Sequence, residues 1–307
     1  MLTETLKLYE DREDVTLTTY IISEKGEMSR QGKHPAVLIC PGGGYFNCSD
    51  REAEPVALQF NAMGYHAFVL RYSTYIQGEE RVRDIIGKPL QPNFQTKHPA
   101  PVREIGKAML VIGKYSEEWA VDVKRIAVCG FSAGAHNAAM YGAYWDKPLV
   151  TEFLNADKEM LRPAALILGY MLSDYTYMKK NMNRDSNEMH FFNASCTAFL
   201  GEPEPDEKLL EEVSPARLVT EMMPPAFLWA TSEDTLVSVQ NTIRMAHALA
   251  DHAIPFEMHI FEKGQHGLSV GTQISATSKS QINSDAAEWI RLAERWLAKR
   301  FSLDLPE

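Results

Sequence analysis

The sequence predicts an α/β fold: a mostly parallel, doubly wound sheet of about seven to eight strands, with helices on both faces. Seven short apolar runs recur along the chain, and from the second onward they are apolar at nearly every position. Strands that are buried on both faces show this pattern, which is typical of parallel sheets. Segments with helical spacing lie between the runs, and such alternation builds a doubly wound sheet with right-handed crossovers.

The predicted strands are short and follow one another along the whole chain. Their cores read AVLIC in the second run, RIAVC in the fourth and AALIL in the fifth, which indicates burial on both faces. The seven runs span residues 15–23, 36–40, 66–72, 125–129, 164–169, 226–230 and 255–261.

Helical spacing is clearest in residues 102–119, where apolar residues recur three or four positions apart, at Ile105, Ala108, Ile112 and Tyr115. A second helix, at residues 133–144, follows the fourth strand directly and is rich in alanine. Similar patterns predict helices at residues 52–63, 238–252 and 285–300.

A single domain over residues 1–307 is the organisation that the sequence favours. The chain has no internal repeat, no low-complexity tract and no linker rich in Pro, Gly or Ser. Two connections are long for a compact fold, at about residues 73–101 and 170–224. Because long insertions often form lids or pocket walls, we expect both of them to cover a pocket.

Composition narrows the class of partner. The chain has 31 Lys and Arg against 41 Asp and Glu, a formal net charge of −10 that argues against nucleic acid or an anionic membrane as the main partner. Hydrophobic residues at 45% and charged residues at 23% exclude a disordered, collagen-like or coiled-coil chain. Neither a secretory signal nor an apolar run of the ~18 residues that span a bilayer is present, so we expect a cytoplasmic protein.

The sequence predicts no metal and no cofactor. The spacings of Cys40, Cys48, Cys129 and Cys196 match no zinc pattern, and Cys40 and Cys129 lie inside strand-like runs, as buried thiols do. The nine histidines form neither H-x-x-x-H nor H-E-x-x-H.

The clearest motif is the segment RIAVCGFSAGAHNAA at residues 125–139, in which G-x-S-x-G joins a predicted strand to a helix. The turn is so sharp that side chains at Gly130 and Gly134 would clash with neighbouring backbone. The Ser132 hydroxyl is then held at a helix N-terminus, whose positive end favours the negative charge that develops in acyl transfer. Ser132 is the predicted nucleophile, and a serine N-cap on an ordinary helix is the alternative.

A glycine run follows the second predicted strand, in VLICPGGGY at residues 37–45. Its spacing differs from a G-x-G-x-x-G dinucleotide loop, and no helix begins at once. Acyl-transfer hydrolases place backbone N–H donors at this position, where glycine lets the backbone approach the substrate oxygen. We expect an oxyanion hole from Gly43 and Gly44, joined by the N–H of Ala133; a flexible turn is the alternative.

An acid and a base follow later strands. Asp234 lies just past the strand at 226–230, where catalytic groups collect in such sheets, and His266 lies in a glycine-flanked loop after the last strand. The chain order Ser132, Asp234, His266 is one known order of a catalytic triad. Asp234 would hold the imidazole tautomer, and His266 would take the Ser132 proton and pass it to the leaving group.

Three other side chains compete for these roles. Glu233 is adjacent to Asp234, but only one of the two can point at the histidine. Asp174 follows the preceding strand and is the next candidate acid. His136 is four residues from Ser132, one helical turn below it, so we expect this side chain to point into the fold.

Together these stretches resemble the α/β-hydrolase esterase/lipase family, and more narrowly its acetylxylan esterase-like (acetylesterase) members. The resemblance runs from about residue 35 to 301 and rests on ICPGGGY, EPVALQFNAMGYHAFVLRYS, EEWAVDVKRIAVCGFSAGAH, FLWATSEDTLVSVQNTIRMAHAL and FEKGQHGL. It implies the α/β-hydrolase fold and the site residues named above. Related esterases often carry a histidine where this chain has Pro41. Any contribution of an imidazole at this position is therefore absent here.

The resemblance implies a serine carboxylesterase for short-chain acyl esters, acetyl above all, with sugars or xylo-oligosaccharides as the alcohol part. The expected partner is therefore a small-molecule ester. Tyrosines stack on sugar faces and hydrogen-bond sugar hydroxyls, which makes Tyr45, Tyr170 and Tyr175 candidate pocket residues; simple packing of the insertions is the alternative. An exposed edge strand or the helix with Trp289 and Trp296 would be the surface of a homodimer.

Two other functions stay open. An arylformamidase- or peptidase-like amide hydrolase would use the same triad, and a non-catalytic member of the fold would bind ligands or partners. Intact Ser132, Asp234 and His266 argue against the non-catalytic reading.

Overall fold

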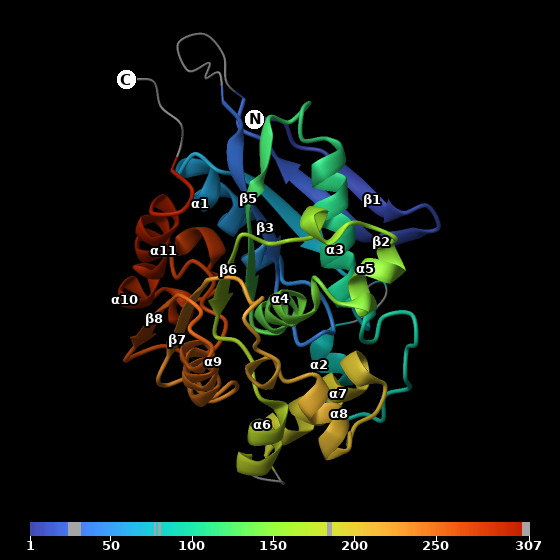
Figure 1. Ribbon diagram of the computed structural model, residues 1–307. Coiled ribbons are helices and arrows are strands. Elements are labelled where there is room, and N and C mark those ends of the chain that lie inside the picture. The colour runs from blue at the N-terminus through green and yellow to red at the C-terminus, as the bar shows by residue number, and fades with distance from the viewer. Residues whose placement is uncertain (24–31, 77, 79–80, 183–185, 303–307) are drawn as a thin grey trace.

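The computed structural model describes residues 1–23, 32–76, 78, 81–182 and 186–302. The strands in these ranges are β1 (Thr5–Tyr9), β2 (Arg12–Tyr20), β3 (His34–Cys40), β4 (His66–Arg71), β5 (Val121–Phe131), β6 (Ala165–Gly169), β7 (Ala226–Thr231) and β8 (Phe256–Phe261). They form one sheet in the order β1-β2-β4-β3-β5-β6-β7-β8 (Figure 1). β2 pairs antiparallel with β1 and β4, and the other neighbouring pairs are parallel. The predicted mostly parallel α/β sheet is confirmed.

The hairpin of β1 and β2 at one edge of the sheet was predicted only in part. The sequence pattern placed the first strand at residues 15–23, whereas β2 begins at Arg12, and β1 was missed. β1 reads TLKLY, and Leu8 is its only buried residue. An edge strand that buries so little carries too sparse an apolar pattern to be recognised.

Helices cover both faces of the sheet (Figure 1). One layer contains α3 (Ala100–Lys114), α4 (Ala133–Tyr144), α5 (Pro148–Leu154) and α9 (Gln240–Asp251), and the other contains α1 (Glu54–Ala62), α10 (Ser284–Ala287) and α11 (Trp289–Ala298). Successive residues of a strand face opposite layers, so Leu38 joins the first core and Val37 the second. The predicted helices are present, and α4 has the predicted bounds. α5 was not predicted.

The last helix differs from its prediction in one way that matters for assembly. Trp289 and Trp296 are buried against the sheet, where Trp289 stacks on Trp229 with ring centroids 5.2 Å apart. These tryptophans therefore do not offer the dimer surface that the sequence suggested. An amphipathic helix turns its largest apolar side chains toward the core, which explains this placement.

The two long insertions pack together at one end of the molecule. The first contains α2 (Val82–Ile85), and the second contains α6 (Tyr175–Asn181), α7 (Asn187–Leu200) and α8 (Glu207–Glu212), which gather in the lower part of Figure 1. The backbone N–H of His98 in the first insertion donates to the Phe199 carbonyl in the second, at 2.7 Å. β5 and β6 end near this group of helices, so the insertions lie over the carboxyl ends of the strands.

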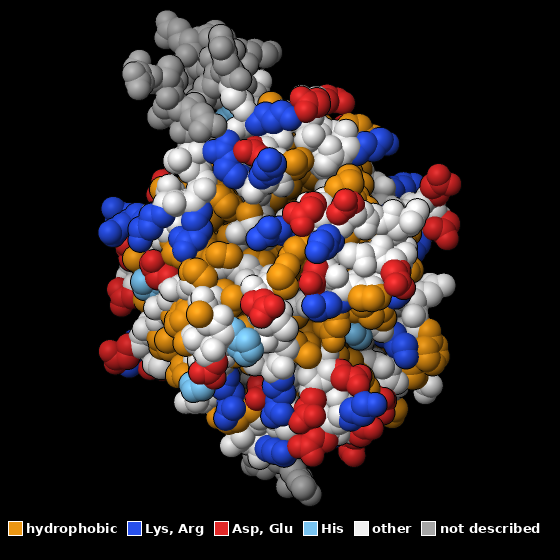
Figure 2. Space-filling view, viewed as in Figure 1, with side chains coloured by type: hydrophobic (Ala, Val, Ile, Leu, Met, Phe, Trp, Pro, Cys, Tyr) orange, Lys and Arg blue, Asp and Glu red, His pale blue; other side chains and the backbone are white. Residues whose placement is uncertain are grey.

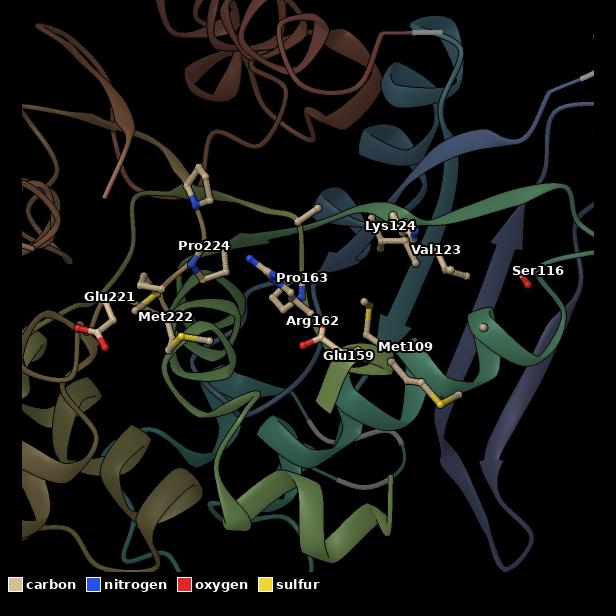
Figure 3. Close-up of a pocket in the computed structure, with 16 residues that line it drawn as sticks. Met109, Ser116, Val123, Lys124, Glu159, Arg162, Pro163, Glu221, Met222 and Pro224 are labelled. Carbon is tan, nitrogen blue, oxygen red and sulfur yellow. The ribbon is translucent and has the colours of Figure 1, made fainter. Parts of the chain in front are cut away.

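A cavity of about 790 Å³ lies at the other ends of the strands (Figure 3). We call it the methionine–proline cavity, because its lining includes Met109, Met160, Met222, Met223, Pro163, Pro224 and Pro225. Acidic and basic side chains are interspersed over the face shown in Figure 2, so the net charge is not gathered there in one patch. None of the helices in the described ranges combines the length and apolar character that a membrane crossing requires.

Candidate active site

Ser132 occupies a sharp turn between β5 and α4. β5 ends one residue before it and α4 begins one residue after it, and Ser132 itself has φ +51° and ψ −120°. A Cβ atom at Gly130 would lie 2.3 Å from the Gly134 carbonyl oxygen, and one at Gly134 would lie 2.0 Å from that of Cys40. Only glycine fits at both positions, so sterics explain why the segment reads G-x-S-x-G. The positive φ at Ser132 is the backbone strain that this turn requires.

Three side chains from separate loops meet at this turn. The Ser132 Oγ lies 2.8 Å from His266 Nε2, and His266 Nδ1 lies 2.6 Å from Asp234 Oδ2. The other carboxylate oxygen of Asp234 accepts the backbone N–H groups of Leu236, at 3.0 Å, and Val237, at 2.9 Å. Asp234 is buried, so its carboxylate is held in one orientation and can fix the His266 ring. This arrangement can move a proton from the serine hydroxyl to the imidazole.

The glycine loop after β3 lies directly against Ser132. A Cβ atom at Gly42 would lie 2.9 Å from the Ser132 Cβ. Gly43 and Gly44 have φ of +130° and +63°, which suits glycine, and the loop closes through a bond from Phe46 N–H to the Gly43 carbonyl. Within the described ranges, the N–H groups of Gly43, Gly44 and Ala133 have no acceptor from the chain itself. They are free to donate to a substrate oxygen.

The competing acids have other partners. Glu233 is exposed and pairs with Lys263 at 3.0 Å, a hydrogen bond that lowers the pKa of Glu233. Asp174 accepts the Tyr177 N–H at the start of α6 and lies 3.3 Å from Arg217. Neither carboxylate is bonded to His266, which has Asp234 on its Nδ1 side.

His136 points into the fold, as the helical spacing predicted. Its Nε2 donates to the Val213 carbonyl at 2.8 Å, so its Nδ1 is the acceptor for the Tyr45 hydroxyl at 2.5 Å. The ring is fully buried, and burial lowers the pKa of His136 to about 3. His136 is therefore a neutral wall residue beneath Ser132.

A small apolar cavity opens beside Ser132, and we call it the Ser132 pocket. Its volume is about 40 Å³. Its lining from the catalytic core and the loop after β7 is Gly44, Tyr45, Ser132, Ala133, His136, Leu236 and Val237. The insertion at 170–224 supplies the rest, Leu172, Tyr175, Met178, Met182, Phe191, Phe192 and Ser195. The insertion at 73–101 contributes none of the lining residues in the described ranges. Among the described residues, therefore, the insertion at 170–224 alone forms part of the pocket wall, whereas both insertions were expected to do so.

Two of the three candidate pocket tyrosines line this cavity. Tyr45 and Tyr175 are buried in its wall and present ring surface, since the Tyr45 hydroxyl is engaged by His136. The expectation for Tyr170 was wrong. Its side chain lies in the core on the other face of the sheet, and its hydroxyl donates to Glu52 at 2.6 Å. Tyr170 follows the last residue of β6 and has φ +36°, so the backbone leaves the extended conformation there. Continued alternation would place Tyr170 on the same face as Leu166 and Leu168, but it packs in the opposite layer, away from the pocket.

Sequence reasoning missed several residues at the site. Met178, Met182, Leu236 and Val237 line the pocket. Of these, Leu236 and Val237 could have been found, because they lie two and three positions after Asp234 in the same loop. Glu52 is buried close to the glycine loop. The sequence offered little to indicate this, because Glu52 only follows the loop within a polar run. No group of three or more His, Cys, Asp or Glu side chains that could hold a metal ion is present in the part of the chain that the structure describes.

The fold and the strand–serine–helix turn define an α/β-hydrolase of the esterase class. The BD-FAE family model matches residues 90–249, more than half of the chain, and this match includes Ser132 and Asp234 but ends before His266. The chain belongs to the BD-FAE family. The predicted resemblance to α/β-hydrolase esterases is thereby confirmed.

Curated proteins and solved structures agree with this class. Over 241 residues the chain is 32% identical to "Endo-1,4-beta-xylanase B" of Butyrivibrio fibrisolvens. This alignment covers 78% of this chain and 33% of the xylanase. The chain thus spans about a third of the length of that relative. The carboxylesterase Cest-2923 from Lactobacillus plantarum WCFS1 covers 100% of both chains, with 27% identity and a TM-score of 0.79. An acetyl ester-xyloside bifunctional hydrolase from Caldicellulosiruptor lactoaceticus covers 96% of both, with 29% identity and a TM-score of 0.71.

Proposed function

We propose that the protein is a serine carboxylesterase that hydrolyses short-chain acyl esters, acetyl above all, through an acyl-enzyme on Ser132. The pair of hydrogen bonds that joins Ser132 to His266 and His266 to Asp234, at 2.8 and 2.6 Å, carries this proposal. A nucleophile within reach of a base, and a base oriented by a buried acid, are the parts that activate a serine hydroxyl.

In the proposed reaction, the Ser132 Oγ attacks the ester carbonyl carbon while its proton passes to His266 Nε2. The carbonyl oxygen becomes an oxyanion that accepts the free N–H groups of Gly43, Gly44 and Ala133. The carbon–oxygen bond to the alcohol then breaks, and the alcohol leaves with the proton from His266. Water, deprotonated by His266, attacks the acyl-enzyme, and the acid product and the Ser132 hydroxyl are released.

The size of the Ser132 pocket supports a short acyl group. A volume of about 40 Å³ exceeds the ~10–15 Å³ that one water needs, but leaves room for only a few heavy atoms. The lining is mainly apolar, which suits a methyl group rather than a charged one. A longer acyl chain would have to displace Phe191, Phe192 or Met178.

For the alcohol part we propose acetylated sugars, in particular xylo-oligosaccharides. The names of the xylanase relative and of the acetyl ester-xyloside hydrolase support this choice. The cytoplasmic location and the homodimer stay predictions.

The test is hydrolysis of p-nitrophenyl esters from acetate to octanoate, with Ser132→Ala measured in parallel. The proposal predicts activity that is highest on acetate and absent in the variant, and it predicts release of acetate from acetylated xylo-oligosaccharides. Activity that rises toward octanoate would contradict the short acyl pocket. No ester hydrolysis at any chain length would favour the amide hydrolase or the non-catalytic alternative.

A further inference from the structure

A buried carboxylate connects two parts of the site that lie far apart in the sequence. Glu52 is the last residue of the 3-10 turn η2 (Asp50–Glu52), and its side chain is only 4% exposed. Its Oε2 accepts the backbone N–H of Gly42, at 2.7 Å, and its Oε1 accepts the Tyr170 hydroxyl, at 2.6 Å. A charged side chain is costly to bury, so the fold has satisfied both of its oxygens.

The first connection leads to the glycine loop. Gly42 immediately precedes Gly43 and Gly44, whose N–H groups are the proposed oxyanion donors. A Cβ atom at Gly42 would lie 2.8 Å from Glu52 Oε2 and 2.9 Å from the Ser132 Cβ. The glycine loop therefore packs directly between the Glu52 carboxylate and the nucleophile. The bond from Gly42 N–H to Glu52 thus fixes the loop at the point where it passes Ser132.

The second connection leads to the loop that carries His266. The Tyr170 hydroxyl accepts the backbone N–H of Ser269 at 3.0 Å, three residues after the histidine. Since that hydroxyl accepts from Ser269, its own hydrogen goes to Glu52, and both Glu52 oxygens act as acceptors, as an ionised carboxylate requires. The Tyr170 ring also packs against the His266 ring, with centroids 5.1 Å apart.

The residue before Glu52 strengthens the same contact. Arg51 Nη1 donates to the Gly267 carbonyl at 2.9 Å, and the Ser269 hydroxyl donates to the Arg51 carbonyl at 2.6 Å. Burial raises the pKa of Glu52, while its hydrogen bonds from Tyr170 and Gly42 and the nearby Arg51 act in the opposite direction. η2 therefore contacts the histidine loop directly through the side chain and the carbonyl of Arg51, and Glu52 is linked to that loop through Tyr170.

We propose that Glu52 is a positioning residue for ester hydrolysis. Its carboxylate holds the oxyanion loop at Gly42 and, through Tyr170, the loop of His266, so that donors and base keep their places around Ser132. Glu52 contacts no reacting atom itself. This inference rests on the proposed function, because it assigns Glu52 a part in the same reaction.

The test is the substitution Glu52→Gln, measured with p-nitrophenyl acetate. The amide has the same size, but its nitrogen cannot accept a hydrogen bond, so Gly42 or Tyr170 loses its acceptor. We expect kcat to fall roughly 10- to 100-fold, the loss that a small misplacement of reacting groups produces, with KM within about threefold of wild type. The matched control is Glu54→Gln, an exposed glutamate two residues on, which should keep wild-type kinetics.

A second variant, Tyr170→Phe, tests the histidine connection without touching the buried charge. It keeps the ring against His266 and removes the hydroxyl that links Glu52 to Ser269, and we expect kcat to fall about tenfold. If Glu52→Gln does not fold, this variant carries the test.

Three outcomes would overturn the inference: Glu52→Gln with kcat within threefold of wild type, an effect of that variant on KM alone, or Tyr170→Phe with wild-type kinetics. Ser132→Ala, assayed in parallel, separates the two proposals. An active Ser132→Ala refutes the proposed function. An inactive Ser132→Ala together with a fully active Glu52→Gln refutes only the role of Glu52.

Discussion

The Ser132 pocket is much smaller than the methionine–proline cavity, yet it is the smaller of the two that contains the candidate catalytic residues. The first has a volume of about 40 Å³ and the second about 790 Å³. The small one lies where β3, β5, β6 and β7 end, and the large one lies where β5, β6 and β7 begin (Figure 3). Catalytic groups gather at the carboxyl ends of parallel strands, because the loops that follow neighbouring strands meet there. Position in the sheet therefore identifies the site better than volume does.

The lining of the two hollows shows the same contrast in chemical terms. The methionine–proline cavity is lined by Lys124, Arg162, Glu159 and Glu221 among apolar residues, and no histidine is among its lining residues in the described ranges. Its serine, Ser116, has no base beside it there. The Ser132 pocket has a nucleophile, a base and free N–H donors within a few ångströms.

The largest expected effect comes from removing the nucleophile. Ser132→Ala should lower kcat by about 10⁴- to 10⁶-fold while the fold survives, because the variant lacks the hydroxyl that forms the acyl-enzyme. Ser116→Ala, the same change in the methionine–proline cavity, should leave kcat within twofold. Steady-state hydrolysis of p-nitrophenyl acetate measures both, and a Ser132→Ala variant within tenfold of wild type would refute the assignment.

The acid comes next. Asp234→Asn should lower kcat by about 10⁴-fold, because the amide no longer holds the imidazole tautomer that accepts the Ser132 proton. Glu233→Gln, at the adjacent position, should change kcat less than threefold, since Glu233 faces solvent and Lys263. If Glu233→Gln were the more damaging of the two, the acid would be misassigned.

A smaller effect is expected from widening the pocket. Phe191→Ala should raise the ratio of octanoate to acetate hydrolysis about tenfold or more, because a bound methylene in an apolar pocket discriminates at that level. Met160→Ala in the methionine–proline cavity should leave this ratio unchanged, which makes it the matched control. An unchanged ratio in Phe191→Ala would show that the acyl chain binds elsewhere.

The smallest effect is expected on the pH dependence of stability, through His136 in the pocket wall. His136 is neutral there because burial lowers its pKa to about 3. In the unfolded chain the pKa of a histidine is about 6.5. Between about pH 6.5 and pH 3 the unfolded state therefore binds more protons at His136 than the native state does, and the free energy of unfolding falls as the pH falls. His136→Gln removes this dependence. The loss of unfolding free energy in the variant should be largest at pH 7 and shrink toward pH 5, by at most about 1.4 kcal/mol per pH unit. Urea denaturation of both proteins at pH 7, 6 and 5 measures this difference in unfolding free energy. A difference that stays constant with pH would contradict a buried, neutral His136.

The parts of the site that depend on local sterics could be predicted from the sequence. The turn at Ser132 needs glycine at Gly130 and Gly134, so the motif shows the structure directly. The positions of Asp234 and His266 follow from where strands end. The placement of both side chains was as expected, although their catalytic roles remain proposals.

The parts that depend on long-range packing could not be predicted. Part of the pocket wall comes from α6 and α7, whose residues meet Ser132 only once the insertion has folded over the sheet. Tyr170 turned to the other face, and Glu52 became buried, although a glutamate in a polar run is normally exposed. The hydrogen-bond partners of Tyr170 are Glu52 and Ser269, which lie 118 and 99 residues from it in the sequence, so no local pattern signals these contacts.

The central claim is that Ser132 is the activated nucleophile, and labelling with a fluorophosphonate tests it most directly. We predict one phosphonyl adduct per chain, mapped by mass spectrometry to Ser132, with loss of esterase activity in step with labelling and no adduct in His266→Ala. An adduct on a different serine, or full esterase activity in a protein that does not react with the probe, would contradict the account.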